Sequence, residues 1–443
     1  MLSFGTDGIR GRANEALSVS LALAVGVAVA DVFGESQVLV GRDTRESGPM
    51  LQAAVSAGLM SRGTDALDMG VAPTGEIAFA SSSLSLPAVV VSASHNPYFD
   101  NGLKVFAPGG RKLSDRQQHD MELRIASYLG DSDSSLSPVE LIGGTRQIDM
   151  SPNYIDHIMA SVGGVISKPP RVVLDFANGA ASLIGPKLFN RLGVEVVGAI
   201  GDSPDGRNIN FQCGSTHPKR LSEAVIESGA DLGLAFDGDA DRVIAVDETG
   251  ELVDGDQLMV IFAKTLARQE RLTGSGIVAT VMSNLGLHKA MAEAGIRLVL
   301  TPVGDRFVLD ALEREGYALG GEQSGHIIFA DYATTGDGLL TGALLLAHLA
   351  ECPTSFSELV AGSMVKFPQI LESIRVDDPA GAVNSSRVLD VLAQVESELG
   401  DSGRVVLRAS GTEPVVRVMV EAVTLADAES AVSKLMLVLG RHS

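Results

Sequence analysis

The stretch VVVSASHNPYFDNGLKVFAPGG, residues 89–110, joins an apolar run to a polar turn that contains a proline. Its valines predict a buried strand, after which the chain passes through two serines, a histidine and an asparagine before it reaches Lys104. In α/β proteins, ligands bind where strands end at the edge of the sheet. We therefore expect Ser94 and His95 to face a crevice, with Ser92 as the alternative nucleophile.

Short β-branched runs alternate with longer helical windows along most of the chain, which is typical of a parallel α/β architecture. The alternation repeats in three units of about a hundred residues each. The last region differs and predicts a smaller α+β domain with adjacent antiparallel strands. The predicted domains are residues 1–147, 148–249, 250–365 and 366–443.

The composition limits the classes of partner. Aromatic residues make up only 4% of the chain and tryptophan is absent, so we expect aliphatic cores. A net charge of -21 argues against nucleic acid or an anionic membrane as a partner, because both require a basic face. The two cysteines, Cys213 and Cys352, have neither a disulfide framework nor metal-ligand spacing, which favours a cytoplasmic protein with reduced thiols.

One apolar run, residues 18–33, imitates a signal peptide, with Arg10 and Arg12 upstream of it. The segment before it is rich in glycine and contains an acid, unlike the short basic start of a signal peptide. The run is also too short to span a bilayer, so we predict a buried helix.

Three carboxylates, Asp237, Asp239 and Asp241, follow a predicted buried strand in AFDGDADRVIAVDETGE, residues 235–251. At alternate positions beside a glycine, they can converge on one hard cation. A calcium EF-hand does not fit, because Arg242 occupies the position that requires glycine and a strand follows. The other alternative, a solvated acidic turn, would crowd three like charges together. We predict a Mg²⁺ site with room for water and a phosphate oxygen.

Two further segments carry polar side chains in patterns that suit a sugar phosphate. Glu322, Ser324 and His326 alternate, so an extended backbone would present them on one face towards the hydroxyl or amino groups of a sugar. A hairpin with exposed polar residues is the equal alternative. The segment RASGTEPVVRV offers hydroxyls, backbone N–H groups and guanidiniums for a phosphate, although a turn with surface arginines remains open. The residues of this predicted phosphate cradle are Arg408, Ser410, Gly411, Thr412 and Arg417.

If Ser94 faces the cation held by the aspartates, its hydroxyl oxygen can carry and donate a phosphoryl group. Such a transfer depends on charge neutralisation and in-line positioning more than on covalent chemistry by the protein. Lys104 lies on the same excursion and can activate a hydroxyl or stabilise charge.

Together, the segments SASHNP, DGDADR, GEQSGH and RASGTEP closely resemble, in this order, the α-D-phosphohexomutase superfamily. Within it, FGTDGIRG, NINFQCGSTHP, TPVGDRFV and Gln323 resemble the bacterial phosphoglucosamine mutase family. The resemblance implies four domains around a central cleft, three of them similar α/β domains, with one loop from each. The segment that follows Lys104 departs mildly from the family pattern, which affects only the local shape of the loop.

The resemblance also implies roles for individual residues. Ser94 matches the phosphoserine, and its phosphate joins three aspartates as ligands of Mg²⁺: Asp237, Asp239 and Asp241. Positions implicated in proton handling or near the transferring phosphate are matched by His95, Lys104, Arg10 and Arg242. Sugar hydroxyls would be bound by Glu322, Ser324 and His326. The non-reacting phosphate would be held by Arg408, Ser410, Gly411, Thr412 and Arg417.

The implied activity is that of an isomerase that interconverts glucosamine 6-phosphate and glucosamine 1-phosphate. It would use a phosphoserine enzyme and a sugar 1,6-bisphosphate as intermediate and activator, and would feed UDP-N-acetylglucosamine and cell-wall precursor synthesis. Its partners would be small sugar phosphates, and the oligomeric state is open between monomer and homodimer. Two other activities stay open: a phosphomannomutase/phosphoglucomutase, and a metal-dependent phosphatase in which water intercepts the phosphoserine. A non-catalytic sugar-phosphate or calcium-binding protein is a third alternative.

Overall fold

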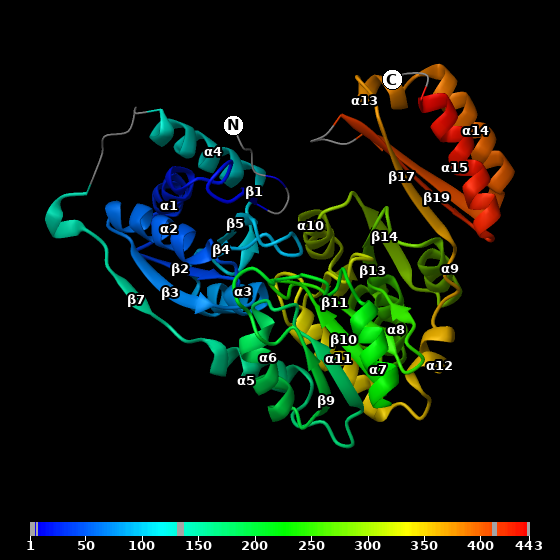
Figure 1. Cartoon of the computed structure of the whole chain (residues 1–443), viewed down its shortest axis with the longest axis horizontal. Coiled ribbons are helices and arrows are strands. Elements are labelled where there is room, and N and C mark those ends of the chain that lie inside the picture. The colour runs from blue at the N-terminus through cyan, green and yellow to red at the C-terminus, as the bar shows by residue number, and fades with distance from the viewer. Residues whose placement is uncertain (1–4, 6–7, 131–136, 410–413, 441–443) are drawn as a thin grey trace.

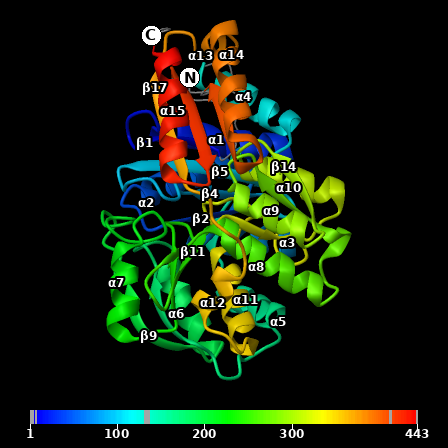
Figure 2. The ribbon, with the colours of Figure 1, turned by 90° about the vertical axis from the view of Figure 1, so that its right-hand side faces the viewer.

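The computed structural model describes residues 5, 8–130, 137–409 and 414–440, and the descriptions below concern these residues. Their strands form four sheets, which succeed one another along the chain (Figure 1). The first sheet lies on one side of the molecule and the fourth on the other, with the second and third below and between them. Figure 2 shows the last helices standing clear of the second and third sheets.

The first sheet has seven strands in the order β1-β5-β4-β2-β3-β7, with β6 paired to β5. Helices α1, α2 and α4 cover one face and α3 the other, so each face has an aliphatic core, as the composition predicts. The strands are β1 (Ile9–Arg12), β2 (Gln37–Arg42), β3 (Asp65–Val71), β4 (Ala88–Val91), β5 (Asp100–Ala107), β6 (Arg111–Lys112) and β7 (Thr145–Gln147). The helices are α1 (Val19–Phe33), α2 (Gly48–Ser61), α3 (Thr74–Leu84), α4 (Asp115–Leu129) and the 3-10 turn η1 (Val139–Leu141).

Helix α1 is the apolar run that imitates a signal peptide, and the structure buries it as predicted. The side chain of Ser18 caps its first turn, and Gly34 ends it in a left-handed conformation. Gly26 of α1 packs against α2, and Gly58 of α2 packs against α1. A Cβ at Gly26 would stand 2.1 Å from the carbonyl oxygen of Val55, so only glycine permits this packing distance. None of the described helices is long and apolar enough to cross a membrane.

The second sheet has the order β12-β11-β10-β8-β9, and the third has the order β14-β13-β15-β16. The elements of the second region are β8 (Arg171–Asp175), β9 (Glu195–Ile200), β10 (Leu232–Phe236), β11 (Val243–Asp247), β12 (Leu252–Val253), α5 (Ser151–Ser161), α6 (Ala181–Arg191) and α7 (Lys219–Ser228). Those of the third are β13 (Gly276–Thr280), β14 (Arg297–Thr301), β15 (Leu319–Gly321), β16 (Ile327–Phe329), α8 (Gly255–Arg268), η2 (Thr273–Ser275), α9 (Leu285–Glu293), α10 (Asp305–Glu315), α11 (Gly338–Glu351) and α12 (Phe356–Ala361).

One hydrophobic core joins the second and third sheets. Helix α11, from the third region, packs against β10 and β11 of the second, and a Cβ at Gly342 would stand 3.1 Å from Leu234. This buried cluster contains residues of both regions, from Tyr154 to Met364. Residues on both sides of the predicted boundary between residues 249 and 250 therefore share one hydrophobic core. The domain limits stay predictions.

The last region is a smaller three-stranded antiparallel sheet in the order β17-β19-β18, with α14 and α15 packed on it. Its elements are β17 (Gln369–Arg375), α13 (Pro379–Val383), α14 (Ser386–Leu399), η3 (Gly400–Ser402), β18 (Gly403–Ala409), β19 (Val415–Ala422) and α15 (Leu425–Leu439).

The first three sheets differ from the parallel architecture that the sequence predicts. Each has a parallel centre, but one edge continues as an antiparallel pair: β4–β5, β10–β11 and β15–β16. The reason is the length of the connections, because a link of a few residues can join only antiparallel strands. These three links, and the link between β18 and β19, carry the four segments that the sequence analysis selects.

Candidate active site

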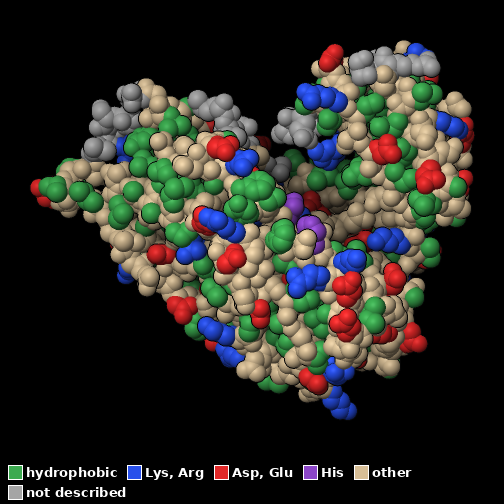
Figure 3. Space-filling model, in the orientation of Figure 1, with side chains coloured by type: hydrophobic (Ala, Val, Ile, Leu, Met, Phe, Trp, Pro, Cys, Tyr) green, Lys and Arg blue, Asp and Glu red, His purple; other side chains and the backbone are tan. Residues whose placement is uncertain are grey.

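The β4–β5, β10–β11 and β15–β16 links lie close together, since Ser94 contacts Asp237 and His326 lies 3.7 Å from Asp241. Figure 3 shows a deep cleft between the first and last regions, with histidine side chains at its base. Direct contacts between the first two links fix the centre of the site. Ser94, on the β4–β5 link, donates a hydrogen bond from Oγ to Oδ2 of Asp237, on the β10–β11 link, at 2.5 Å.

The structure separates the two candidate serines. Both are fully buried, but the hydroxyl of Ser92 donates to Asp43 at 2.7 Å and accepts the backbone N–H of Ser94 at 2.9 Å. Ser92 is thus part of the framework behind the turn. The hydroxyl of Ser94 is the one that faces the aspartates.

The three aspartates form a compact buried cluster. Ligand oxygens of Asp237, Asp239 and Asp241 all lie within 4.8 Å of one another. One oxygen each of Asp239 and Asp241 is buried without a hydrogen-bond partner. Burial and the two neighbouring carboxylates raise the pKa of Asp237 well above its usual range. Unpartnered carboxylate oxygens in a buried acidic cluster are a costly arrangement that a divalent cation relieves, so the residues fit a metal site.

Gly238 lets this cluster approach the serine. A Cβ there would stand 2.5 Å from the carbonyl oxygen of Ser94, closer than side-chain carbons approach backbone oxygens. The glycine in DGDADR therefore permits both the turn and the contact between the two links.

Lys104, on β5, is buried and reaches the same cluster. Its Nζ donates to Oδ2 of Asp239 at 2.8 Å and to Oδ2 of Asp241 at 3.0 Å. Burial alone would raise the pKa of Asp241, but Lys104 and His326 hold it well below its usual range. Lys104 is therefore a counter-charge within the acidic cluster, beside the Ser94 turn.

His95 and two arginines surround the serine. Nδ1 of His95 lies 3.2 Å from Oγ of Ser94. Burial, and then the charges of Arg242 and Arg10, lower the pKa of His95 to about 4, so its imidazole is neutral near pH 7. Arg10 donates to the carbonyl of Ala93 at 3.4 Å, and Arg242 lies 3.9 Å from Asp241. The structure brings all of these predicted residues together.

The predicted extended presentation of Glu322, Ser324 and His326 is wrong. Residues 322–325 form a tight turn between β15 and β16, in which Gly325 has a φ of 89°. Ser324 is exposed, whereas His326 is buried and lies 3.7 Å from both Asp241 and Asp305. The chain does reverse direction, as in the hairpin alternative, because the link between β15 and β16 is short. That alternative also expected exposed polar residues, and this part is wrong for His326, which is buried.

The fourth link lies partly outside the described residues, which include neither Ser410, Gly411 nor Thr412. Its flanking arginines are described: Arg408 on β18 and Arg417 on β19 are direct cross-strand partners. Burial and the charge of Arg417 lower the pKa of Arg408. Like charges placed opposite each other destabilise a sheet, which an anion between them would relieve.

Comparison with known proteins agrees with this arrangement. Four models of the phosphoglucomutase/phosphomannomutase family match in chain order: alpha/beta/alpha domains I, II and III at residues 1–129, 152–250 and 254–367, and the C-terminal domain at residues 371–437. The chain is 47% identical to the phosphoglucosamine mutase of Rhodococcus erythropolis over 99% of both chains. It is 49% identical to that of Desulforudis audaxviator over 95% of this chain and 93% of the relative. The chain belongs to the phosphohexomutases, in their phosphoglucosamine mutase branch.

Solved structures of other phosphohexomutases have the same fold. A phosphoglucomutase/phosphomannomutase family protein from Burkholderia thailandensis is 27% identical, with a TM-score of 0.81 over 100% of this chain and 98% of that one. The N-acetylphosphoglucosamine mutase of Aspergillus fumigatus, solved with GlcNAc-6P and magnesium, is 18% identical, with a TM-score of 0.72 over 100% of this chain and 96% of that one. The present phosphohexomutase is accordingly an isomerase with three α/β/α domains and a C-terminal domain.

Thr74, which the sequence did not predict, also belongs to this phosphohexomutase site. Thr74, at the start of α3, is buried and donates from Oγ1 to Oδ2 of Asp239 at 2.7 Å, while its N–H binds the carbonyl of Asp239 at 2.9 Å. Its signal in the sequence was the Pro-Thr-Gly that follows strand β3. That strand ends at the same edge of the sheet as β4.

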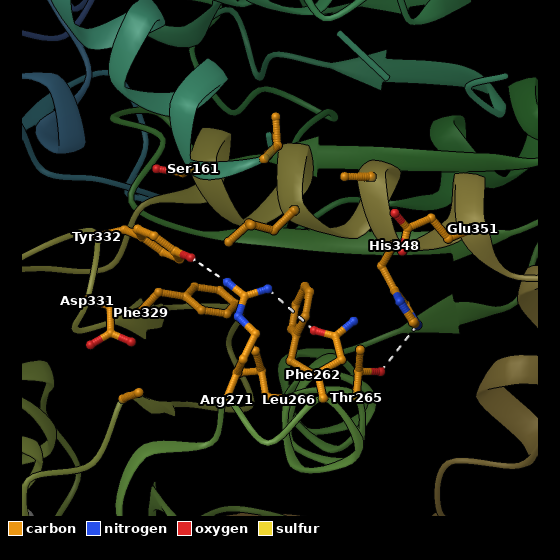
Figure 4. A pocket seen from close by; sticks show the side chains of 15 residues that line it. Ser161, Phe262, Thr265, Leu266, Arg271, Phe329, Asp331, Tyr332, His348 and Glu351 are labelled. Carbon is orange, nitrogen blue, oxygen red and sulfur yellow. Dashed lines mark hydrogen bonds between the residues drawn. The ribbon is translucent and has the colours of Figure 1, made fainter. Parts of the chain in front are cut away.

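A separate cavity of about 150 Å³ lies beside α8 and α11 (Figure 4). Arg271 donates to the hydroxyl of Tyr332 there at 2.8 Å, and Thr265 lies 3.3 Å from His348. None of the predicted site residues lines this cavity, so it is distinct from the site of the phosphohexomutase chemistry.

Proposed function

We propose that this phosphohexomutase interconverts D-glucosamine 6-phosphate and α-D-glucosamine 1-phosphate. The observation that carries the proposal is the 2.5 Å contact between the hydroxyl of Ser94 and the aspartate cluster. It places a nucleophilic oxygen beside a cation site, which phosphoryl transfer requires. The choice of amino sugar is supported by relatives 46–49% identical that carry the name phosphoglucosamine mutase.

In this proposal Ser94 carries a phosphoryl group. The bond between phosphorus and Oγ of Ser94 breaks as a bond forms to the 1-hydroxyl of glucosamine 6-phosphate, and the proton of that hydroxyl passes to Oγ. The resulting 1,6-bisphosphate turns in the cleft. Its 6-phosphoryl group then returns to Oγ, the proton moves to the 6-oxygen, and glucosamine 1-phosphate leaves.

The contacts divide the protein's work between His95 and Lys104. A neutral imidazole 3.2 Å from Oγ of Ser94 can relay the proton, so we assign this role to His95. Lys104 is held by hydrogen bonds to two carboxylates, and we assign to it the neutralisation of negative charge beside Ser94. Arg10 and Arg242, which flank the serine, would hold the transferring phosphoryl group.

We propose that Mg²⁺ binds between Asp237, Asp239 and Asp241. Carboxylate oxygens are its preferred ligands, and two buried oxygens of this cluster, one each on Asp239 and Asp241, have no hydrogen-bond partner among the described residues. When bound, the ion would neutralise charge on the transferring phosphoryl group and on Oγ of Ser94.

The C-terminal domain would hold the other phosphate of the sugar. Arg408 and Arg417 are partners across the antiparallel pair, and their guanidiniums can grip an anion from two sides. Glu322 accepts the N–H of Gly304 at 3.1 Å, and with the exposed Ser324 it stays a proposed contact for the sugar hydroxyl and amino groups. We also propose a cytoplasmic location, where sugar phosphates are available.

The test has two parts. Glucose 1,6-bisphosphate should transfer one phosphoryl group to the purified protein at Ser94, measured by intact mass and peptide mapping. Comparison of kcat/KM for the phosphates of glucosamine, glucose and mannose should favour glucosamine. Preference for glucose or mannose would support a phosphoglucomutase or phosphomannomutase instead, and release of inorganic phosphate without isomerised sugar would support a phosphatase.

A further inference from the structure

Arg45, which lies beyond the end of β2, is a fully buried arginine whose whole guanidinium is engaged. Nε donates to Asp43 at 2.8 Å. Nη2 donates to the carbonyls of Ser94 and Asn96, both at 2.8 Å. Nη1 donates to the carbonyl of Asp100 at 3.0 Å and also to that of Pro97. These contacts use the five N–H donors that arginine has, and four of them hold the backbone of the serine turn.

Asn210 grips the same turn from the second region of the chain. Its Nδ2 donates to the carbonyl of Ser94 at 2.9 Å and to that of Asn96 at 3.1 Å. Asn210 is also buried, at 5% exposure, so these hydrogen bonds are shielded from water. Two side chains from different regions therefore hold the same pair of carbonyl oxygens.

The turn needs such support because Ser94 has a φ of 53°, in the left-handed region. A residue with a Cβ adopts this conformation at an energetic cost, and it persists only where the surroundings over-determine it. The N–H of Ser94 is fixed by Ser92, and Arg45 and Asn210 fix its carbonyl. Because the direction of Cβ follows the backbone, the three contacts together aim Oγ at Asp237.

We infer that Arg45 and Asn210 are positioning residues for phosphoryl transfer by Ser94. The inference rests on the proposed role of Ser94 as the phosphoryl carrier. The charge of Arg45 is paired with Asp43, all five of its N–H donors are engaged, and both residues are buried behind the serine turn. Their effect should therefore fall on the transfer step and leave substrate affinity unchanged.

The test compares Arg45→Lys and Asn210→Ala with a matched control, Arg62→Lys. Lysine at position 45 keeps the positive charge that pairs with Asp43, but it lacks the planar guanidinium that donates to four backbone carbonyls. Arg62 is also nearly buried, with 8% of its side chain exposed, and pairs with Asp31 at 3.3 Å, but it lies at the end of α2, away from the serine turn. Each variant would be assayed for thermal midpoint, for kcat and KM with glucosamine 6-phosphate, and for the rate at which glucose 1,6-bisphosphate phosphorylates Ser94.

Misplacement of a reacting group by about 1 Å costs about 10²-fold in rate. We expect Arg45→Lys to lower kcat and the phosphorylation rate together by about that factor, and Asn210→Ala to lower both by about 10-fold, since it removes fewer contacts. KM should stay within about twofold of the wild-type value for both variants, because neither residue is assigned a contact with the substrate. The control should keep wild-type kcat, whatever its thermal midpoint.

The inference is overturned if both variants phosphorylate Ser94 at the wild-type rate per folded molecule, or if kcat falls only as the folded fraction falls. Should Arg45→Lys not fold, Asn210→Ala decides alone, and an unchanged rate there overturns the inference. Failure of the wild type itself to accept a phosphoryl group on Ser94 would instead refute the proposed function, and the role of the two residues with it.

Discussion

Glu76, on α3, offers a prediction whose size follows from the structure. The residue is 3% exposed, and its carboxyl group accepts a hydrogen bond from Ser151 at 3.0 Å. Burial, and to a smaller extent the nearby charges of Asp149 and Asp337, raise its pKa from 4.5 to about 7 against the opposing effects of the hydrogen bond from Ser151 and the charge of Lys187. We predict that Glu76→Gln stabilises the protein, because glutamine keeps the acceptor for Ser151 and never ionises.

The sign of the stability change and the pH range in which it occurs follow from the pKa values of Glu76 in the unfolded and the folded protein. The unfolded chain ionises Glu76 above pH 4.5, while the folded protein keeps it protonated until about pH 7. The wild type therefore loses stability as the pH rises through this window, and the loss is constant above it. At about 1.4 kcal/mol per pKa unit, the full loss is about 3 kcal/mol. The variant should be more stable by about this amount near pH 8 and equal to the wild type below about pH 4.5.

Urea unfolding of both proteins at a series of pH values measures the difference. Glu396→Gln, an exposed substitution on α14, is the control for the same chemical change at the surface of the protein. A difference for Glu76→Gln that does not change with pH, or a variant less stable than the wild type near pH 8, would refute the reasoning.

Three further predictions concern the site. Ser94→Ala should abolish mutase turnover and keep the thermal midpoint of the wild type within a few degrees; turnover retained with phosphate on Ser92 would contradict this. Asp239→Asn should lower kcat by about two or more orders of magnitude through lost metal charge, and excess chelator should inactivate the wild type, which a fully active chelated enzyme would disprove. Lys104→Met removes the ammonium group that donates to two of the aspartates. It should lower kcat, but it should also tighten Mg²⁺ binding several-fold, as measured by calorimetry, because a competing positive charge is gone. Weaker Mg²⁺ binding would instead show that Lys104 shapes the metal site.

The sequence predicted the centre of the site because its parts are local. Ser94 and the three aspartates each follow a strongly apolar strand directly, so the end of the strand fixes where they lie. Without the family resemblance, the choice between Ser92 and Ser94 could not be made from the sequence, since it depends on Asp43, which lies 49 residues before Ser92.

The supporting residues escaped prediction because their partners are distant in the chain. Arg45 and Asn210 meet the carbonyl of Ser94 across 49 and 116 residues, and no local pattern records such contacts. The error at residues 322–326 has another cause. Alternating polar side chains lie on one face of the chain only if the backbone is extended. The link between β15 and β16 is too short for an extended segment, so the chain turns there.

The helix α11 has a consequence for the synthesis of the protein. Strand β10 ends at Phe236, but the helix that covers it begins only at Gly338. At about 5–20 residues per second, a ribosome takes roughly 5–20 s to make the intervening chain. During that interval the nascent second sheet exposes the apolar face on which α11 will pack, so the growing polypeptide should recruit chaperones at this stage and release them once Glu351 has emerged.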